Sequence, residues 1–176
     1  MKVVVLRLGH RIERDKRITT HVCLSARALG ANEAILSDER DSSILESVED
    51  IAQRWGGDFK VSYEKNWRSV LKAKKAEGYE IIHLTMYGLR VQDEIKKIRE
   101  SGKDKLIVVG GEKVPGEVYQ IADYNISVSG QPHSEVAALA ITLHELFSGK
   151  ELEKEFNNPK IKLVPSKAGK TIINQV

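Results

Sequence analysis

The chain has 176 residues, of which 41% are hydrophobic and 30% charged, and its net charge is +3. This length and composition suit a single globular domain with a sizeable core. We expect neither a membrane span nor a signal peptide, because no apolar run is long enough for either. The single cysteine, Cys23, excludes an internal disulfide and predicts a reducing compartment, the cytoplasm. Since no Cys/His cluster occurs, we expect no metal site.

Charge is distributed unevenly along the chain. Residues 1–30 contain seven basic and two acidic residues, and residues 160–176 contain four lysines and no acidic residue. The two ends therefore carry +5 and +4, and the segment between them carries −6. Basic ends on an acidic body are typical of a polyanion-binding surface and equally of a solvated surface, so charge alone leaves both interpretations open.

Short apolar runs alternate with amphipathic segments along the first hundred residues. Apolar runs predict strands at 2–8, 33–36, 59–63 and 80–84. Helical spacing predicts helices at 19–29, 41–55, from 65 or 66 through at least 73, and 91–99. Thr19 and Thr20 are the expected cap of the first helix, and the charged run 11–17 is predicted as a loop. Only Gly9 follows the first strand, so the G-x-G-x-x-G pattern of a Rossmann nucleotide site is missing.

The stretch 105–149 contains two further strands, each followed by a loop and a helix. The strand at 106–109 ends at Gly110-Gly111, and the strand at 124–128 ends at the sequence SGQP. Pro132 is the expected start of a helix that continues to Phe147, with Gly149 as its stop. The alternation of strands and helices predicts an α/β fold with a mostly parallel sheet and helices on both faces. Ligands bind outside the carboxyl ends of such strands, so the paired glycine loops favour a ligand site over simple turns.

The last segment, 151–176, has a different pattern. A short charged helix is predicted at 151–156, followed by β-type runs at 161–164 and 171–173 around a glycine-containing loop. Two such runs predict a β-hairpin, which is too small to be stable unless it packs on the domain or a partner. We therefore expect a main domain at 1–150 and a C-terminal extension with a β-hairpin at 151–176.

Two long blocks resemble a known family. The sequence VVGGEKVP, followed by ADYNISVSGQPHSEVAALA, resembles the cofactor-binding half of the SPOUT RNA methyltransferases. The resemblance implies a C-terminal trefoil knot at about residues 80–149, S-adenosyl-L-methionine as the cofactor, a C-terminal hairpin and a homodimer. The N-terminal block LRLGHRIERDKRITTHVCLSARALGA is similar to that of archaeal members acting on tRNA. It implies 2'-O-methylation of a ribose in tRNA, that of cytidine 56 in the T-loop.

By this resemblance, three loops at 84–88, 110–114 and 128–135 hold the cofactor. Leu84 is expected to pack on an apolar face of the cofactor, and loop backbone groups are expected to bond its base and ribose. The implied cofactor-binding residues are Leu84, Gly110, Gly111, Glu112, Lys113, Val114, Val128, Ser129, Gly130, Gln131, Pro132, His133, Ser134 and Glu135.

Methyl transfer to a hydroxyl requires close positioning and a group that takes or shares the hydroxyl proton. Arg17, His21 and Arg27 lie in the N-terminal block and are the candidate catalytic residues. Arginine is a poor base because its pKa stays above about 12, whereas histidine is a common proton acceptor, which makes His10 and His21 candidates. His21 and Arg27 diverge by about 120° on a regular helix, so they cannot both point at one atom. His133 is expected to contact the cofactor or cap a helix.

The candidate RNA-binding residues lie at the two basic ends: Arg11, Arg14, Arg17, Lys162, Lys167 and Lys170. Aromatic residues make up only 6% of the chain, which argues against an extended stacking platform. Tyr87 is the one aromatic residue in a cofactor loop. The helix at 132–147 carries Ala137, Ala138 and Ala140 beside leucines, and we expect it to form the dimer interface.

Two other functions fit the same loops. One is a non-catalytic module that binds a nucleotide or S-adenosylmethionine. The other is a knotted methyltransferase that acts on a base nitrogen. Methyl transfer to RNA distinguishes the first of these from an enzyme, and the position of the methyl group distinguishes the second.

Overall fold

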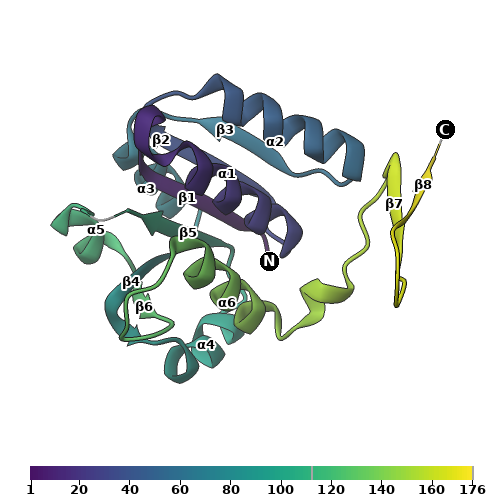
Figure 1. Ribbon diagram of the computed structural model, residues 1–176. Coiled ribbons are helices and arrows are strands. Elements are labelled where there is room, and N and C mark those ends of the chain that lie inside the picture. The colour runs from purple at the N-terminus through teal and green to yellow at the C-terminus, as the bar shows by residue number, and fades with distance from the viewer. Residues whose placement is uncertain (112, 176) are drawn as a thin grey trace.

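The computed structural model describes residues 1–111 and 113–175, and its centre is a six-stranded parallel sheet (Figure 1). The strand order is β3-β2-β1-β5-β4-β6, so the chain builds one half of the sheet before crossing to the other. The strands of this sheet are β1 (Val3–His10), β2 (Glu33–Asp38), β3 (Lys60–Tyr63), β4 (Glu80–Arg90), β5 (Lys105–Gly110) and β6 (Tyr124–Ser127). The helices are α1 (Ile12–Ala28), α2 (Ser42–Trp55), α3 (Trp67–Ala76), α4 (Val91–Glu100), α5 (Gly116–Ile121) and α6 (Glu135–Phe147). The predicted α/β class with a mostly parallel sheet is confirmed.

Helices cover both faces of the sheet, and alternate strand residues supply the two cores. On β1, Val3 and Val5 pack with residues of α1, α4 and α6, whereas Val4, Leu6 and Leu8 pack with residues of α3 and α5. Side chains of successive strand residues point to opposite faces, so a fully apolar strand serves both cores at once. Cys23 lies in a third core beneath α2, where burial raises the pKa of its thiol to about 12. Cys23 lies on α1 and packs there as a small apolar residue.

Two predicted helix starts were wrong. The first helix begins at Ile12 rather than Thr19, because the Glu39 carboxylate accepts a hydrogen bond from the Ile12 N–H at 2.8 Å. The charged run 11–17 is therefore mostly helical. The last helix begins at Glu135 rather than Pro132, because Ser134 caps it by accepting from the Ala137 N–H at 3.1 Å. Pro132 lies in the loop before the cap.

The pairing of β4 with β6 shifts register after Leu84. Ile126 is paired with both Leu84 and Leu89, so residues 85–88 of β4 form an irregularity opposite one residue of β6. Gly88 lies in this irregularity, where a Cβ would come within 2.5 Å of the Asn125 carbonyl oxygen. The irregularity lies within the range 80–149, where a knot is expected.

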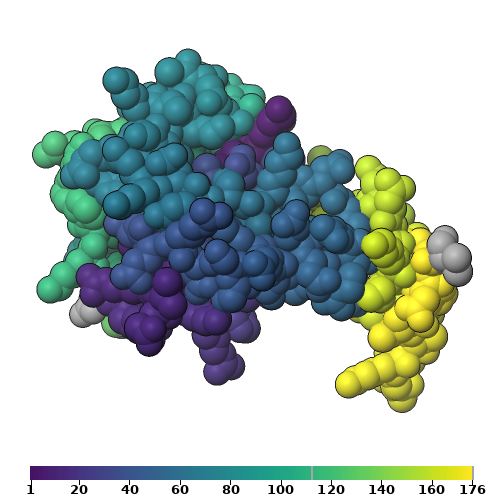
Figure 2. Space-filling view, turned by 90° about the horizontal axis from the view of Figure 1, so that it is seen from above, coloured from purple at the N-terminus to yellow at the C-terminus, as the bar shows by residue number. Residues whose placement is uncertain are grey.

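The C-terminal hairpin forms as predicted, with β7 (Ile161–Val164) antiparallel to β8 (Thr171–Asn174). It projects from the end of the molecule beside α2, as the yellow segment in Figures 1 and 2 shows. Backbone hydrogen bonds join it to the body: Lys160 N–H to the Arg54 carbonyl and Gly57 N–H to the Asn157 carbonyl. The preceding charged segment is a single 3₁₀ turn, η1 (Lys150–Glu153), and is shorter than the predicted helix. None of the described helices is both long and apolar enough to cross a membrane.

Candidate functional site

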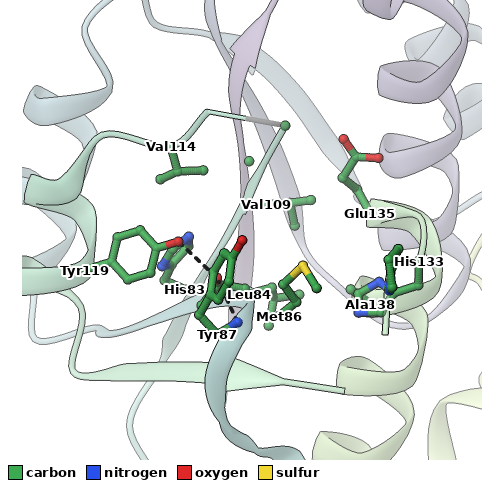
Figure 3. Close-up of a pocket in the computed structure, with 14 residues that line it drawn as sticks. His83, Leu84, Met86, Tyr87, Val109, Val114, Tyr119, His133, Glu135 and Ala138 are labelled. Carbon is green, nitrogen blue, oxygen red and sulfur yellow. Dashed lines mark hydrogen bonds between the residues drawn. The ribbon is translucent and has the colours of Figure 1, made fainter. Parts of the chain in front are cut away.

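A cavity of about 450 Å³ lies at the carboxyl ends of β4 and β5 and beside the start of α6 (Figure 3). Its walls come from the second half of β4, from the end of β5 and the loop after it, from α5, and from α6 and the loop before it. The lining residues are His83, Leu84, Thr85, Met86, Tyr87, Val109, Gly110, Gly111, Val114, Tyr119, Pro132, His133, Glu135 and Ala138. We call it the knot cavity.

Seven of the predicted cofactor residues line the knot cavity, and they come from all three predicted loops. They are Leu84, Gly110, Gly111, Val114, Pro132, His133 and Glu135. Lys113 lines a second cavity on the other side of the same loop. The lining does not include Val128, Ser129, Gly130, Gln131 or Ser134, and Glu112 lies outside the described residues.

The two adjacent glycines have different surroundings. A Cβ on Gly110 would overlap the Val114 side chain, so the fold of the loop itself requires glycine there. A Cβ on Gly111 would lie 3.8 Å from its nearest neighbours, the guanidinium nitrogens of Arg7 and Arg14. Gly111 lines both cavities. Because it has no side chain, a ligand in either cavity can approach its backbone closely.

Arg7 is a buried cation close to the knot cavity and is not among the residues predicted from the sequence. Its Nη2 lies 3.8 Å from the Glu135 carboxylate and 4.0 Å from that of Asp15. Its Nη1 donates to the Leu8 carbonyl at 3.1 Å, and its Nε donates to the Thr19 hydroxyl at 3.3 Å. Burial lowers the pKa of Arg7, while Glu135 and Asp15 raise it. Arg7 therefore ties the carboxyl end of β1 to α1 and to the start of α6.

Hydrogen bonds among His83, Asn125 and Tyr119 fix which ring nitrogen of His83 carries the proton. The Asn125 side chain donates from Nδ2 to the Tyr119 carbonyl at 2.9 Å, so its Oδ1 faces His83 Nδ1, also at 2.9 Å. His83 Nδ1 must then carry the proton. Burial lowers the pKa of His83, which keeps the ring neutral. The ring packs edge-on against Tyr119, whose hydroxyl bonds Thr85 in the cavity wall (Figure 3).

The second cavity, of about 420 Å³, lies at the carboxyl ends of β1 and β2. Its lining residues are Leu8, Gly9, His10, Arg11, Arg14, Asp38, Glu39, Trp67, Gly111, Lys113 and Pro115. Both cations and carboxylates face it, in contrast to the more apolar knot cavity. We call it the charged cavity.

The candidate catalytic residues are divided between two places. Arg17 and His21 line a shallow groove of about 390 Å³ with Arg14 and Ile18 of α1 and Val136 of α6. Arg27 lies at the other end of α1, where its Nη2 donates to the Gly56 carbonyl at 2.6 Å and its guanidinium stacks over Phe156. The divergence expected for His21 and Arg27 is confirmed, and the structure does not bring Arg27 to either cavity.

His10 is fully buried in the wall of the charged cavity. Its Nδ1 bonds the Thr19 hydroxyl at 2.9 Å, and its Nε2 lies 3.7 Å from the Asp41 carboxylate. Burial lowers the pKa of His10. Among the described residues, no three His, Cys, Asp or Glu side chains gather closely enough to hold a metal ion.

Residues 55–173 match the family described as tRNA ribose 2'-O-methyltransferase, aTrm56. The chain belongs to this family. It is 55% identical to the tRNA (cytidine(56)-2'-O)-methyltransferase of Methanothermobacter thermautotrophicus over 172 residues, covering 98% of this chain and 96% of that protein. It is also 55% identical to the enzyme of the same name from Thermococcus kodakarensis over 174 residues, covering 97% of this chain and 96% of that protein.

Solved structures with a similar fold are more distant in sequence. SpoU methyltransferase AviRb from Streptomyces viridochromogenes, in complex with AdoMet, gives a TM-score of 0.61 at 15% identity, covering 84% of this chain and 57% of that chain. A TrmH/SpoU tRNA-modifying enzyme from A. aeolicus gives 0.59 at 15% identity, covering 86% of this chain and 76% of that chain. These likenesses show the fold: this aTrm56 family member has the SPOUT α/β fold with an added antiparallel hairpin.

Proposed function

We propose that this protein transfers a methyl group from S-adenosyl-L-methionine to the 2'-oxygen of cytidine 56 in the T-loop of tRNA. The observation that carries the proposal is the knot cavity, built from all three predicted loops in a chain of the aTrm56 family. Relatives named tRNA (cytidine(56)-2'-O)-methyltransferase share 55% of residues over nearly the whole chain.

The residues of the knot cavity fit this cofactor. The volume of about 450 Å³ is within the usual range for cofactor sites. Leu84, Met86 and Val109 give an apolar wall for the adenine, and the Gly110-Gly111 backbone can approach the ribose closely. Glu135 lines the cavity, and its carboxylate would attract the positive charge of the sulfonium. When bound, the cofactor supplies an activated methyl group, and S-adenosylhomocysteine and one proton leave.

The protein's part in this reaction is to position the ribose and to accept or share the hydroxyl proton. Arg7 fixes the end of β1 against α1 through Asp15 and against α6 through Glu135, a residue of the knot cavity. Asp15 stays ionised, because a side-chain hydrogen bond from Arg14 lowers its pKa. Arg14 and Arg17 offer positive charge beside the hydroxyl, and His21 is the candidate proton acceptor. Both Arg17 and His21 are exposed on the outer face of α1, where a partner chain can bring them to a second site.

Transfer of a tritiated methyl group to unmodified tRNA tests the proposed function. The label should appear at nucleotide 56, and the linkage after that nucleotide should resist alkali, because a 2'-O-methyl group blocks cleavage. Label in an alkali-sensitive nucleotide would support methylation of a base nitrogen instead. Cofactor binding without transfer to any RNA would support the non-catalytic module.

We further propose that the enzyme acts as a homodimer in the cytoplasm, without metal. Residues 1–150 form the catalytic domain in this proposal, and residues 151–176 form an arm. Cys23 is the single cysteine of the chain and is buried as a free thiol, which supports a reducing compartment. Addition of a chelator should leave the rate of methyl transfer unchanged, and a loss of rate would contradict the metal-free mechanism.

The tRNA is proposed to contact two separate basic groups. Arg11, Arg14 and Arg17 lie at the start of α1, and Lys162, Lys167 and Lys170 lie on the hairpin beside the end of α2. The 17 residues of α1 extend over about 25 Å, so one small RNA loop does not span both groups within a protomer. A whole tRNA, or a second protomer, can do so.

Replacing the three hairpin lysines by glutamine should flatten the salt dependence of tRNA binding. Each lost phosphate contact reduces the slope of log affinity against log salt by roughly 0.7 to 0.9. Filter binding at salt concentrations from roughly 50 to 200 mM measures this slope. Lys65, Lys72 and Lys96, exposed on other parts of the surface, form a matched triple control. An unchanged slope in the hairpin variant would remove the hairpin from the RNA surface.

A further inference from the structure

We infer that the charged cavity binds the target nucleotide, and that Asp38 selects cytosine by accepting a hydrogen bond from its exocyclic amine. This inference rests on the proposed function and adds to it the residue that chooses the base. It depends on three features of the described residues: the position of the cavity, the order of charges within it and the fixed carboxylate of Asp38.

The charged cavity adjoins the knot cavity. Gly111 lines both, while its neighbours in the same loop face opposite ways, Val114 to the knot cavity and Lys113 to the charged cavity. A group that binds beside Gly111 in the charged cavity is thus separated from a cofactor in the knot cavity only by Gly111, which has no side chain. The reacting ribose must occupy such a position, because methyl transfer requires contact between the two ligands.

The charged side chains of the cavity are arranged in the order of the strands that they adjoin. Asp38 ends β2 and Glu39 follows it, Arg11 follows β1, and Gly111 and Lys113 follow β5. These three strands are adjacent in the order β2-β1-β5. The carboxylates repel phosphate, so phosphate is favoured on the side of Lys113 and Arg11. The Arg11 guanidinium makes no ion pair within the described ranges 1–111 and 113–175. A nucleotide therefore binds with its base towards β2 and its ribose towards Gly111.

Asp38 presents one carboxylate oxygen in a fixed direction. Its Oδ2 accepts from the Gly9 N–H and from the Ser37 hydroxyl, each at 2.9 Å. Its backbone is left-handed, with a φ of 79°, which is unusual for a residue other than glycine. Its Oδ1 accepts no hydrogen bond from any described residue. Trp67, only 6% exposed, adds an apolar wall beside these polar groups.

A carboxylate oxygen discriminates between the two pyrimidines. Cytosine has an amine donor at position 4, and carboxylates are its usual protein partners. Uracil has a carbonyl oxygen at the same place, which would face the Asp38 oxygen without a proton between them. A site that leaves a polar group unpaired rejects the wrong ligand strongly. The volume of about 420 Å³ suits one pyrimidine nucleotide.

Asp38→Asn tests the inference, because the amide keeps the shape and the acceptor for Gly9 and adds a donor for uracil. Methyl transfer is measured on tRNA with cytidine or uridine at position 56, and kcat/KM for cytidine over uridine is compared. We expect this ratio to fall by at least about 10-fold relative to the wild type, with cofactor affinity unchanged. Glu49→Gln, an exposed carboxylate on α2, is the matched control for loss of charge. Asp38→Gly is a second test in case the first variant does not fold, because glycine suits the left-handed backbone. It should also lose the preference for cytidine over uridine.

Binding of cytidine and uridine 5'-monophosphates gives a readout without turnover. In a Trp55→Phe background, the fluorescence of Trp67 reports on ligands in the charged cavity. The wild type should bind the cytidine nucleotide more tightly, and Asp38→Asn should abolish the difference. An equal loss on both tRNAs, or an unchanged preference in both assays, would overturn the inference. If the wild type methylates no tRNA, the proposed function fails, while the nucleotide titration still decides the role of Asp38.

Discussion

Replacing Gly111 by valine is expected to weaken S-adenosylmethionine binding by roughly 100-fold, about 2.7 kcal/mol, and to leave the fold intact. A Cβ at this position meets only the ends of two arginine side chains at 3.8 Å, so the protein itself tolerates it. The larger side chain instead enters the open space that Gly111 borders on both sides. Isothermal titration calorimetry measures the affinity, and the unfolding temperature reports on the fold.

Two neighbouring glycines serve as controls for this variant. Gly116→Ala, where a Cβ has no neighbour within 4 Å and no cavity is lined, should leave both affinity and stability unchanged. Gly110→Ala should lower the unfolding temperature, because its Cβ would overlap Val114. Wild-type affinity in the Gly111→Val protein would place the cofactor elsewhere.

The local signals of the sequence predicted most of the fold. Asp41 and Asn66 cap α2 and α3 through their own side chains, and such caps depend only on residues two or three positions away. The start of α1 could not be predicted in this way. Glu39, 27 residues from Ile12 in the sequence, bonds the first turn of that helix, and the side chain of the capping residue Arg11 makes no capping hydrogen bond.

Two features of the site depend on contacts between distant segments. Arg7 is a single polar residue in an apolar strand, and only the fold shows that it meets Glu135 and Asp15. The register shift of residues 85–88 against β6 leaves no periodic signal, because it depends on how two distant segments pair rather than on local conformation. The loop after β5 was predictable as a ligand site from its glycines, whereas the seven predicted residues that line the cavity were implied by the resemblance to the SPOUT family.

A test of the proposed dimer interface needs a residue other than Ala138, one of the three alanines expected to lie in it. Ala138 is only 5% exposed and lines the knot cavity, so a charge there would disturb the cofactor site rather than an interface. Ile141 is 44% exposed on the outer face of α6, beside the partly buried Ala137 and Ala140. The adjacent face of α1 adds Ile18, and the two helices pack side by side within the protomer. An apolar surface of two helices suits a two-fold interface, in which each residue is buried twice.

Ile141→Glu is therefore expected to convert a dimer into a monomer. Two-fold symmetry places two unpaired carboxylates in one interface, and each buried, unpaired charge costs several kcal/mol. Light scattering at micromolar concentration measures the mass, with Ile141→Val and the exposed charge variant Gln53→Glu as controls that should remain dimeric. The knot cavity is built within one chain, so the monomer should keep its cofactor affinity. Methyl transfer to tRNA should be lost, because the groove of Arg17 and His21 lies on the face that the partner covers. A wild type that is monomeric at this concentration would contradict the interface and the shared site together.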